Sequence, residues 1–403
     1  MQVYYISRVV NGALIAALAA AVWFSARLAW ADARFHERTL EGVARAIEIL
    51  PDNTEYLLFH ALQLDYEGQN STVLLERAAF LSPRSSTPRI RLGLAAESRG
   101  DAAGAERWLL DAARVDRQFE PRWTLANFFF RQTRRDEFWE WMKRALEVSY
   151  GDRRAAFDLC WRMTSDAGEV LARGIPDGHQ VIAAYLVYVS ETHPEEAAAS
   201  AAARLAAFHD PADRPLLEAA VDTLIAKGRG GEAGALWRLL GRGDPLTGAA
   251  GIFAEGSGFA WHRLSTGGVV HGPAHEPDVH RITLSGKQPE VCDLLARTLL
   301  LTPGKRYVLR WSSRVESAQR GDGFAWRIGD HRFAFTPSPQ WKAQEAVLTA
   351  PADLATLTLV YQRPPGAPRL EGSMELRDVV IAAHPDGTPL ANALPGAAIS
   401  SPR

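Results

Sequence analysis

The chain has 403 residues, of which 47% are hydrophobic and 23% charged, and its formal net charge is −2. This is the composition of a folded protein rather than a disordered one, and the length allows two or three domains with separate cores. A net charge near zero provides no general attraction for nucleic acid, so we expect no nucleic-acid partner. The two cysteines, Cys160 and Cys292, fall in different predicted domains and form neither a disulfide framework nor, by themselves, a zinc site.

The N-terminal segment is almost wholly apolar from Val9 to Ala26. Its length is near the lower limit for a helix that crosses a hydrocarbon core of roughly 30 Å. Trp23 and Trp30 lie near its C-terminal end, where indole rings favour the headgroup region. We therefore expect residues 1–31 to form an uncleaved signal anchor with a single transmembrane helix.

Two other interpretations of this segment remain open. The small side chains of Ala29 and Ala31 fit a signal-peptide cleavage site, although Arg8 is the whole of the basic region before it and Arg27 precedes the site. A buried core helix would show the same apolar run. The basic residues on the two sides give no clean orientation signal. We place the body of the protein on the external or periplasmic side, because signal-like N-termini usually direct the downstream chain across the membrane.

Residues 32–240 are predicted to form antiparallel helix pairs, because Ala, Leu, Arg and Glu predominate between short breaks of Pro, Gly, Asp and Asn. In the clearest unit, Gly93 and Ala105 would let two helices approach, Gly100 would end the first helix, and Leu109 would fill the groove between neighbours. The residues of this unit are Leu92, Gly93, Gly100, Asp101, Ala105, Leu109 and Ala112, and those of a second unit are Leu217, Ala220, Val221, Leu224, Gly228, Ala233, Trp237 and Leu240. Both units resemble the tetratricopeptide repeat, and five or so such units follow one another at a period of about 34 residues. A generic helical bundle is the alternative.

The resemblance to tetratricopeptide proteins implies a concave groove that holds a peptide or a partner helix. The candidate groove residues, at positions expected to be exposed on first helices, are Arg89, Glu97, Asn127 and Arg131. The alternative is that these four side chains are solvated and bind nothing.

The composition changes after Leu240. Residues 241–251 are rich in Gly and small side chains and are predicted to be a linker. From 252 to 385, short segments alternate β-branched or aromatic residues with polar ones between turns, which predicts an antiparallel β-sandwich. Residues 386–403 are expected to form a flexible tail.

The layout of the sandwich segment resembles jelly-roll carbohydrate-binding modules and galactose-binding-like domains. It has an N-terminal aromatic strand, the turn LSGKQP, the segment LTPGKRYVLRWSSR, a strand that begins at Trp341, and the closing segment GSMELRDVVI. The whole chain resembles uncharacterised bacterial proteins that join a membrane anchor and tetratricopeptide repeats to such a domain, a group associated with exopolysaccharide or O-antigen assembly. The resemblance implies a bacterial inner-membrane and envelope context rather than an activity.

The sequence GSGFAW at 256–261 is repeated with one substitution as GDGFAW at 321–326. Phe and Trp two residues apart share one face of a strand, so each pair forms either a platform for sugar rings or part of the core. Aromatic residues in alternating strands are more often buried in the core than exposed. The candidates for glycan contact are Trp261, Trp311, Trp326, Trp341, Tyr361 and Arg363.

The chain shows no catalytic motif of the GxSxG, HExxH, P-loop or Rossmann type. The densest group of possible metal ligands is His262, His271, His275, Asp278 and His280, and its spacing matches no familiar zinc site. We therefore expect no catalytic residue, no metal site and no cofactor. A structural Ca²⁺, common in jelly-roll modules, could take oxygen ligands from Asp322 or Asp378.

These features predict a non-enzymatic, membrane-anchored adaptor in envelope or exopolysaccharide assembly. Its repeats would bind a protein partner, and its sandwich would bind a glycan or a protein. One alternative is a carbohydrate-binding protein that acts mainly through the sandwich. Another is a glycan-active enzyme, because paired carboxylates can come from distant positions in a sequence.

Overall fold

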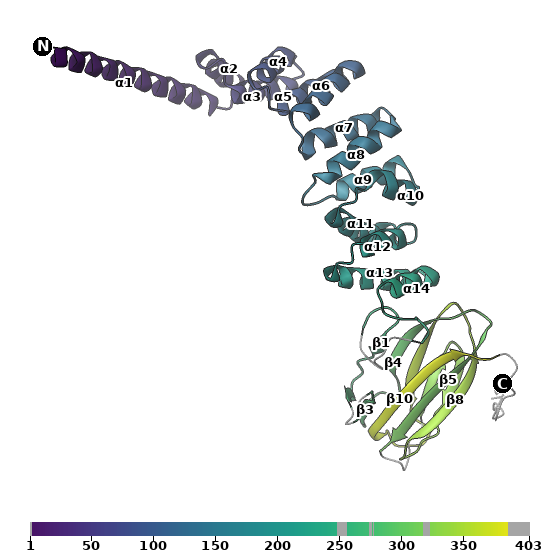
Figure 1. The fold of residues 1–403 in the computed structure, drawn as a ribbon. Helices are drawn as coiled ribbons and strands as arrows, with labels where there is room; N and C mark the ends of the chain where they lie inside the picture. The colour runs from purple at the N-terminus through teal and green to yellow at the C-terminus, as the bar shows by residue number, and fades with distance from the viewer. Residues whose placement is uncertain (1, 248–255, 274–275, 277, 317–322, 386–403) are drawn as a thin grey trace. The chain divides into compact units, whose positions relative to one another are not determined.

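The structure, a computed structural model, describes the chain except for residues 1, 248–255, 274–275, 277, 317–322 and 386–403. Outside these ranges, side chains are described from residue 12 onward. The chain divides into two compact units, Met1–Val181 and Ile182–Arg403. Helices come first and strands second along the chain (Figure 1). The predicted fold class is confirmed: an apolar N-terminal helix and tetratricopeptide-like helix hairpins precede an antiparallel β-sandwich.

The first unit is helical. Its elements are α1 (Gln2–Phe35), α2 (Leu40–Ile49), α3 (Thr54–Tyr66), α4 (Thr72–Leu81), α5 (Thr87–Ser98), α6 (Ala102–Val115), α7 (Phe119–Arg131), α8 (Arg135–Glu147), α9 (Arg154–Met163), α10 (Ala167–Glu169) and the π-helical turn η1 (Val170–Gly174). Consecutive helices pack as hairpins, α1 on α2, α3 on α4, α5 on α6 and α7 on α8.

Local chemistry explains where these helices begin and end. The Asn53 side chain accepts a hydrogen bond from the backbone nitrogen of Glu55 at the start of α3. Asp101 does the same for Gly104 at the start of α6, at 2.8 Å. Such caps satisfy backbone donors that have no partner within the helix. Gly100 follows α5 with a φ of 81°, a left-handed conformation that ends a helix at little cost in glycine.

Close packing between helices depends on small residues, as the sequence predicts. A Cβ atom added at Gly93 of α5 would lie 2.6 Å from Cγ of Leu109 and 3.3 Å from the carbonyl oxygen of Ala105, both on α6. The two helix backbones therefore approach more closely than any side chain at position 93 would allow.

The N-terminal helix α1 continues into the first hairpin. Ala31 and Phe35 of α1 are buried against α2, and the Phe35 ring stacks on Tyr56 of α3 with centroids 4.6 Å apart. Nη2 of Arg27 donates a hydrogen bond to the carbonyl oxygen of Ile49, at the end of α2. The helix thus runs without a break through the predicted boundary at residue 31.

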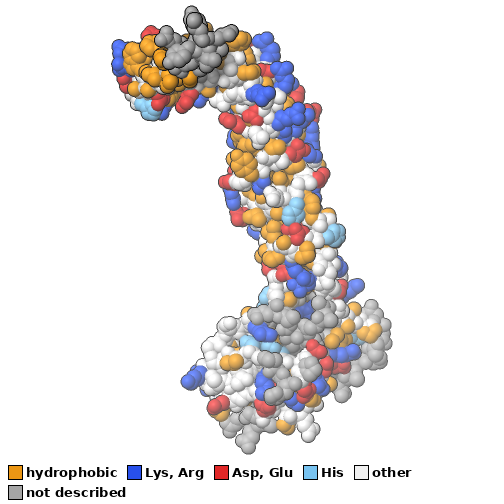
Figure 2. Space-filling model, turned by 60° about the vertical axis from the view of Figure 1, so that its left-hand side comes forward, with side chains coloured by type: hydrophobic (Ala, Val, Ile, Leu, Met, Phe, Trp, Pro, Cys, Tyr) orange, Lys and Arg blue, Asp and Glu red, His pale blue; other side chains and the backbone are white. Residues whose placement is uncertain are grey.

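The N-terminal part of α1 is long and apolar enough to cross a membrane. Within Gly12–Phe35, an 18-residue window has a mean hydropathy of 1.7, and none of this window is buried. Figure 2 shows hydrophobic side chains gathered on this helix, whereas acidic and basic side chains alternate along the later helices.

The second unit begins with helices and ends with the sandwich. Its helical elements are α11 (His179–Thr192), which starts just before the boundary between the units, α12 (Ala198–Ala206), the 3₁₀ turn η2 (Pro211–Asp213), α13 (Arg214–Ala226) and α14 (Gly230–Leu239). The predicted linker 241–251 is described only as far as residue 247, and the predicted tail 386–403 lies outside the described residues.

The described strands form two antiparallel five-stranded sheets. One has the order β1-β4-β9-β6-β7 and the other the order β2-β3-β10-β5-β8. The strands are β1 (Trp261–Arg263), β2 (Val269–Pro273), β3 (His280–Ser285), β4 (Val291–Leu300), β5 (Arg306–Val315), β6 (Phe324–Ile328), β7 (His331–Ala334), β8 (Lys342–Thr349), β9 (Leu354–Gln362) and β10 (Glu371–Ala383). Large apolar side chains from both sheets form one core between them.

A buried guanidinium group fastens the segment after α14 to the sandwich. Arg297 of β4 donates through Nε to the carbonyl oxygen of Phe259, at 3.0 Å, and through Nη2 to that of Pro245, at 3.1 Å. Burial lowers the pKa of Arg297 to about 10, because its charge is taken out of water. The two carbonyl oxygens are the groups that compensate this desolvation.

The close approach at Gly93 is testable. We expect Gly93→Ala to destabilise the helical repeats by about 1–3 kcal/mol, because the added methyl group overpacks the contact with Leu109. The matched control is Gly231→Ala in α14, where a Cβ atom would meet nothing within 4 Å. This control should stabilise the protein by roughly 0.5–1 kcal/mol, since alanine is the better helix former. Helical circular dichroism against temperature measures both, and equal melting temperatures would contradict the packing argument.

Candidate functional site

The candidate groove residue Arg89 is a structural residue. It is 8% exposed, and its Nε donates to the Asp111 carboxylate of α6 at 2.6 Å, while Nη1 donates to the carbonyl oxygen of Ser85 at 2.7 Å. Burial by itself would raise the pKa of Asp111, but hydrogen bonds from Arg89 and Arg114 lower it below its usual value. The prediction that Arg89 lies exposed in a groove is wrong, because the third residue of α5 faces the following helix.

The other helical candidates also bond within the fold. Glu97 of α5 accepts two hydrogen bonds from Arg131 of α7, at 2.8 and 2.7 Å, across 34 residues of sequence. The same separation joins Arg135 to Glu169, so ion pairs recur at the repeat period. Nδ2 of Asn127 donates to the carbonyl oxygen one turn earlier in its own helix. These pairs hold successive repeats in register, and a partner-binding role for them stays a prediction.

Four of the six glycan candidates belong to the core. Trp326 and Tyr361 are 0% exposed, and Trp261 and Trp311 are also buried. The rings of Trp261 and Trp326 lie 5.8 Å apart, so the repeated GxGFAW motif contributes to one internal cluster. No sugar ring can stack on these side chains while the two sheets remain packed. The alternative of core burial is correct for these four, because their positions alternate toward the interior.

The two remaining glycan candidates lie at the surface. Arg363 comes directly after β9, and its Nη2 lies 2.7 Å from a carboxylate oxygen of Glu290. Trp341 precedes β8 and is half-buried. The guanidinium carbon of Arg377 lies 4.1 Å from the centre of the Trp341 ring, and that of Arg314 lies 4.7 Å from it. Trp341 therefore rests on basic side chains of the outer sheet face.

A groove of about 500 Å³ lies over strands β5, β8 and β10. Trp341 precedes its lining residue Ala343 by two positions and does not itself line the groove. Strands β10, β5 and β8 are neighbours in one sheet. The lining residues are Arg310, Ser312, Ala343, Glu345, Asp378 and Val380, together with the intervening Gln344 and the buried Trp311. Ser312 lies opposite Ala343, and Arg310 lies opposite Glu345. Because Ser312 and Ala343 are small, the surface is hollow beside the Arg310–Glu345 pair. The volume is within the range of about 300–1,000 Å³ typical of ligand pockets.

A β-bulge shapes the third side of the groove. The register between β10 and β5 shifts between Arg377 and Val380, and Asp378 has a φ of 57°. A non-glycine residue in the left-handed region is uncommon, and such conformations concentrate at functional sites. Asp378 and Val380 both line the groove. The bulge therefore places a carboxylate and an apolar side chain along the groove, an arrangement that a regular strand would not give.

A buried carboxylate orders the basic side chains beside the groove. Glu375 of β10 is 0% exposed and lies between Arg281 of β3 and Arg314 of β5. Nη2 of Arg281 donates to one carboxylate oxygen at 2.6 Å, and Nε of Arg314 donates to the other. Burial alone would raise the pKa of Glu375, but the hydrogen bonds from the two guanidinium groups lower it. Glu375 thus stays ionised and holds Arg314 under Trp341.

The predicted histidine group is only partly brought together. Nδ1 of His271 lies 3.1 Å from Nε2 of His280 on neighbouring strands. His275 lies outside the described residues. Asp378, one of the two predicted Ca²⁺ ligands, lies 3.3 Å from Nε of Arg377, which disfavours a cation there, and Asp322 lies outside the described residues.

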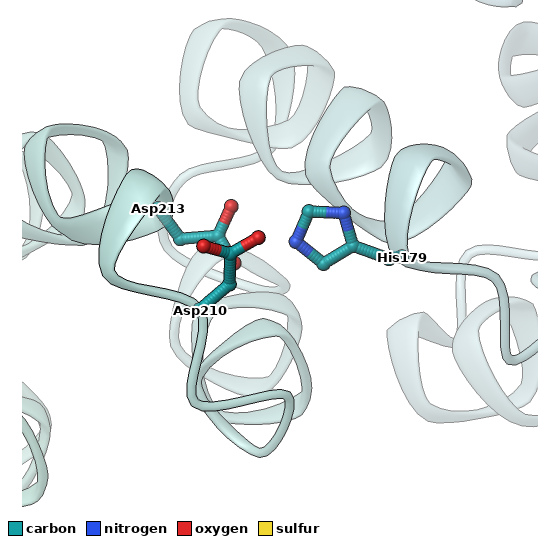
Figure 3. A group of neighbouring side chains, drawn as sticks. All are labelled: His179, Asp210 and Asp213. Carbon is teal, nitrogen blue, oxygen red and sulfur yellow. The ribbon is translucent and has the colours of Figure 1, made fainter.

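Two further carboxylates, Asp210 and Asp213, have oxygen atoms within 4.8 Å of one another at the turn η2 (Figure 3, which also draws His179, the first residue of α11). Asp210 accepts a hydrogen bond from the backbone nitrogen of Ala212, so it caps this turn. Acidic pairs in turns are common without an ion, and we propose no metal here.

Sequence reasoning missed most of the groove. Its polar residues are spread over three segments and carry no motif. The available signal was the alternation in RYVLRWSSR, where Arg310 and Ser312 fall on the face opposite to Leu309 and Trp311. The bulge at Asp378 had no signal in the sequence.

No family model and no curated protein matches the chain. Solved structures resemble separate parts of it. YrrB, described as a TPR protein with an unusual peptide-binding site, is 14% identical over 50% of this chain and 92% of its own, with a TM-score of 0.26. A CBM4 structure is 10% identical over 31% of this chain and 88% of its own, with a TM-score of 0.24. The C-terminal domain of EclA, a sugar-binding protein, is 12% identical over 28% and 83%, with a TM-score of 0.22. No functional conclusion follows from similarities this low.

The buried His280, beside the half-buried His271, predicts an acid sensitivity. Burial, together with the charges of His271 and Arg263, lowers the pKa of His280 from 6.5 to about 4. The unfolded chain binds this proton near pH 6.5 and the folded chain does not, so stability is lost as the pH falls from about 6.5 toward 4. We expect His280→Gln to reduce the fall in melting temperature over this range. His331→Gln, at an exposed position on β7, is the control, and equal pH profiles for the wild type and His280→Gln would contradict the assignment.

Proposed function

We propose that this protein is a non-enzymatic, single-pass membrane adaptor whose sandwich binds a hydroxyl-rich glycan and whose repeats bind a protein partner. We further propose that it acts in bacterial envelope or exopolysaccharide assembly, with the anchor in the inner membrane and the body in the periplasm. The groove lined by the Arg310–Glu345 pair and Asp378, with the half-buried Trp341 two residues before its lining residue Ala343, is the observation that supports the glycan-binding half.

The chemistry of the groove suits a neutral, hydroxyl-rich chain. Glu345 and Asp378 offer carboxylate oxygens to sugar hydroxyl groups, and Arg310 offers N–H donors. The exposed part of Trp341 provides an apolar surface for the C–H face of a pyranose ring. Opposite charges are interspersed along the groove, so no single sign of charge dominates.

Binding rather than bond cleavage is the simpler role for these carboxylates. The side chains of Glu345 and Asp378 are 58% and 63% exposed. A general acid in glycoside cleavage is normally desolvated. A second candidate function, glycan hydrolysis, is motivated only by the presence of both carboxylates in one groove. Release of reducing ends from a bound glycan would favour it.

The anchor is proposed to be retained because α1 serves two purposes. Its N-terminal part is long enough to span a membrane, and its C-terminal part supplies Arg27, Ala31 and Phe35 to the first hairpin. Cleavage after Ala31 would cut a continuous helix and remove Ala31 from the core. The stretch from Val9 to Ala26 spans about 27 Å as a helix, which is close to the hydrocarbon thickness.

Retention of the anchor is testable by protein chemistry. We expect the membrane-extracted protein to keep the segment before residue 32 and to resist release by alkaline carbonate. N-terminal sequencing of protein expressed with its native N-terminus measures the first property. A mature chain that begins at Asp32 would contradict the proposal. We also expect Arg27→Ala to lower the melting temperature of the helical repeats, because it removes the hydrogen bond to Ile49.

Glycan binding is testable with the full chain in lipid nanodiscs. A panel of neutral and acidic polysaccharides, including surface polysaccharide from the source organism, should contain a ligand that binds in the micromolar range. We expect Trp341→Ala and Asp378→Asn each to weaken binding about tenfold, roughly 1.4 kcal/mol. Asparagine is chosen because it tolerates the left-handed conformation and removes only the charge.

The matched control for the glycan experiment is Arg327→Ala on β6 of the opposite sheet. Arg327 also forms a surface ion pair, with Asp293 at 2.7 Å, but lies away from the groove. Its replacement should leave affinity unchanged. Unchanged affinity in the Trp341 and Asp378 variants, with a glycan that does bind, would remove the groove from the proposed function.

A further inference from the structure

The first unit has a cavity that the predicted groove residues do not line. Its volume is about 510 Å³, and it lies between the α3–α4 turn and one face of α5. Gln69 and Asn70 line it from the turn, and Arg91, Leu94 and Arg99 line it from α5 and its C-terminal cap. Neither Arg89 nor Glu97, the predicted α5 residues, takes part.

Two cations at this cavity have no counter-ion among the described residues. Arg91 and Arg99 make no ion pair within that part of the chain, in contrast to Arg77, Arg89 and Arg131, which pair with carboxylates nearby. Asp65, the acidic residue in the lining, accepts a hydrogen bond from the neutral Ser71 hydroxyl and keeps its charge, so the lining carries two positive charges and one negative charge. Because both guanidinium groups line the cavity and neither forms an ion pair there, they are available to a ligand.

The spacing of the two arginines selects an extended anion. They are eight residues apart on one helix, which separates their Cα atoms by about 12 Å along the axis. Both side chains would have to extend toward each other to reach one phosphate or carboxylate, whereas two separate anionic groups require no such convergence. An extended peptide rises about 3.3 Å per residue, so carboxylates three or four residues apart match the 12 Å spacing.

The remaining lining also suits a peptide. Leu94 lies between the two arginines on α5 and is 42% exposed, so it offers an apolar contact midway. The amide groups of Gln69 and Asn70 can both donate and accept, as a peptide backbone requires. A neutral glycan would leave both guanidinium charges without a counter-ion.

We propose that this cavity binds an extended acidic segment of the protein partner, with two carboxylates three or four residues apart on Arg91 and Arg99 and an apolar side chain against Leu94. The inference rests on the proposed function, in which the repeats hold a protein partner, and it names the chemistry of that partner. Pairing of each carboxylate with a guanidinium group contributes to affinity and, through the fixed geometry of the guanidinium donors, to the orientation of the bound segment.

The test uses synthetic peptides and the full chain in nanodiscs. The probe is a fluorescent peptide with the central sequence Glu-Gly-Leu-Gly-Glu, and fluorescence anisotropy measures its binding. Two further peptides act as references: Gln-Gly-Leu-Gly-Gln lacks the charges, and Gly-Leu-Glu-Glu-Gly keeps them adjacent. We expect the first peptide to bind at least about tenfold more tightly than either reference and to weaken as salt is added.

Substitutions then locate the site. Arg91→Ala and Arg99→Ala should each weaken binding at least about fivefold, and Arg91→Lys should weaken it less, because lysine keeps the charge but not the paired donors. The matched control is Arg107→Ala on α6, which removes one exposed positive charge outside the cavity lining. An equal loss in the Arg107 variant would overturn the inference, because the effect would then be general attraction. Displacement of the peptide by inorganic phosphate at an equal concentration would also overturn it, in favour of a compact anion.

A second measurement separates this inference from the proposed function. Cross-linking in intact membranes, followed by purification of the full chain, tests whether the repeats hold any partner. A partner that is captured equally by the wild type and by the double variant Arg91→Ala, Arg99→Ala would overturn the acidic-segment inference and leave the adaptor role standing. A partner that is lost with the double variant and kept with Arg107→Ala supports both.

Discussion

The candidate glycan site depends on the alternation of side chains along β5, β8 and β10. In an antiparallel sheet with one buried face, every second residue faces the core. Because Leu309 and Trp311 are buried in the core, the residues between them and beside them lie on the outer face of the sheet. Arg310, Ser312 and Glu345 are outward for that reason. A shift of one residue in register would bury these polar groups and expose the core, so the same apolar burial that stabilises the sandwich also holds the groove in place.

The bulge in β10 and the buried Glu375 modify that regular surface. The bulge turns Asp378 toward the groove at the expense of a left-handed backbone, and Glu375 holds two arginines at defined positions beside it. Trp341 then covers the guanidinium groups of Arg314 and Arg377. The groove thus combines an ordered rim with a hollow made by small side chains.

In the helical unit, some charged side chains form ion pairs within the fold, whereas Arg91 and Arg99 line a cavity and form none among the described residues. Ion pairs such as Glu97–Arg131 and Arg135–Glu169 recur at a separation of 34 residues and join equivalent positions of successive repeats. Arg91 and Arg99 lie close to Glu97 in the sequence and have no such partner among the described residues. Residues whose charges are satisfied within the fold stabilise the repeats, whereas unsatisfied charges beside a cavity are available for recognition.

The sequence alone determined the fold class of this protein. Periodicities of 3.6 and 2, together with turn residues, separate helices from strands, and local patterns such as Gly93 with Leu109 identify the helix hairpins. The apolar N-terminal stretch is equally local, because a membrane-spanning helix needs only length and composition.

Only the tertiary structure decided which polar and aromatic residues remain accessible. Arg89 and Trp341 illustrate this, since the sequence pattern indicated both as binding residues and the structure buried the first against Asp111 and left the second at the surface. The outcome depends on neighbours that lie 22 residues away for Arg89 and 27 and 36 residues away for Trp341, which no local pattern encodes. Local sequence determines where each helix and strand forms. Which side chains meet in a binding site is determined by the tertiary packing of those helices and strands.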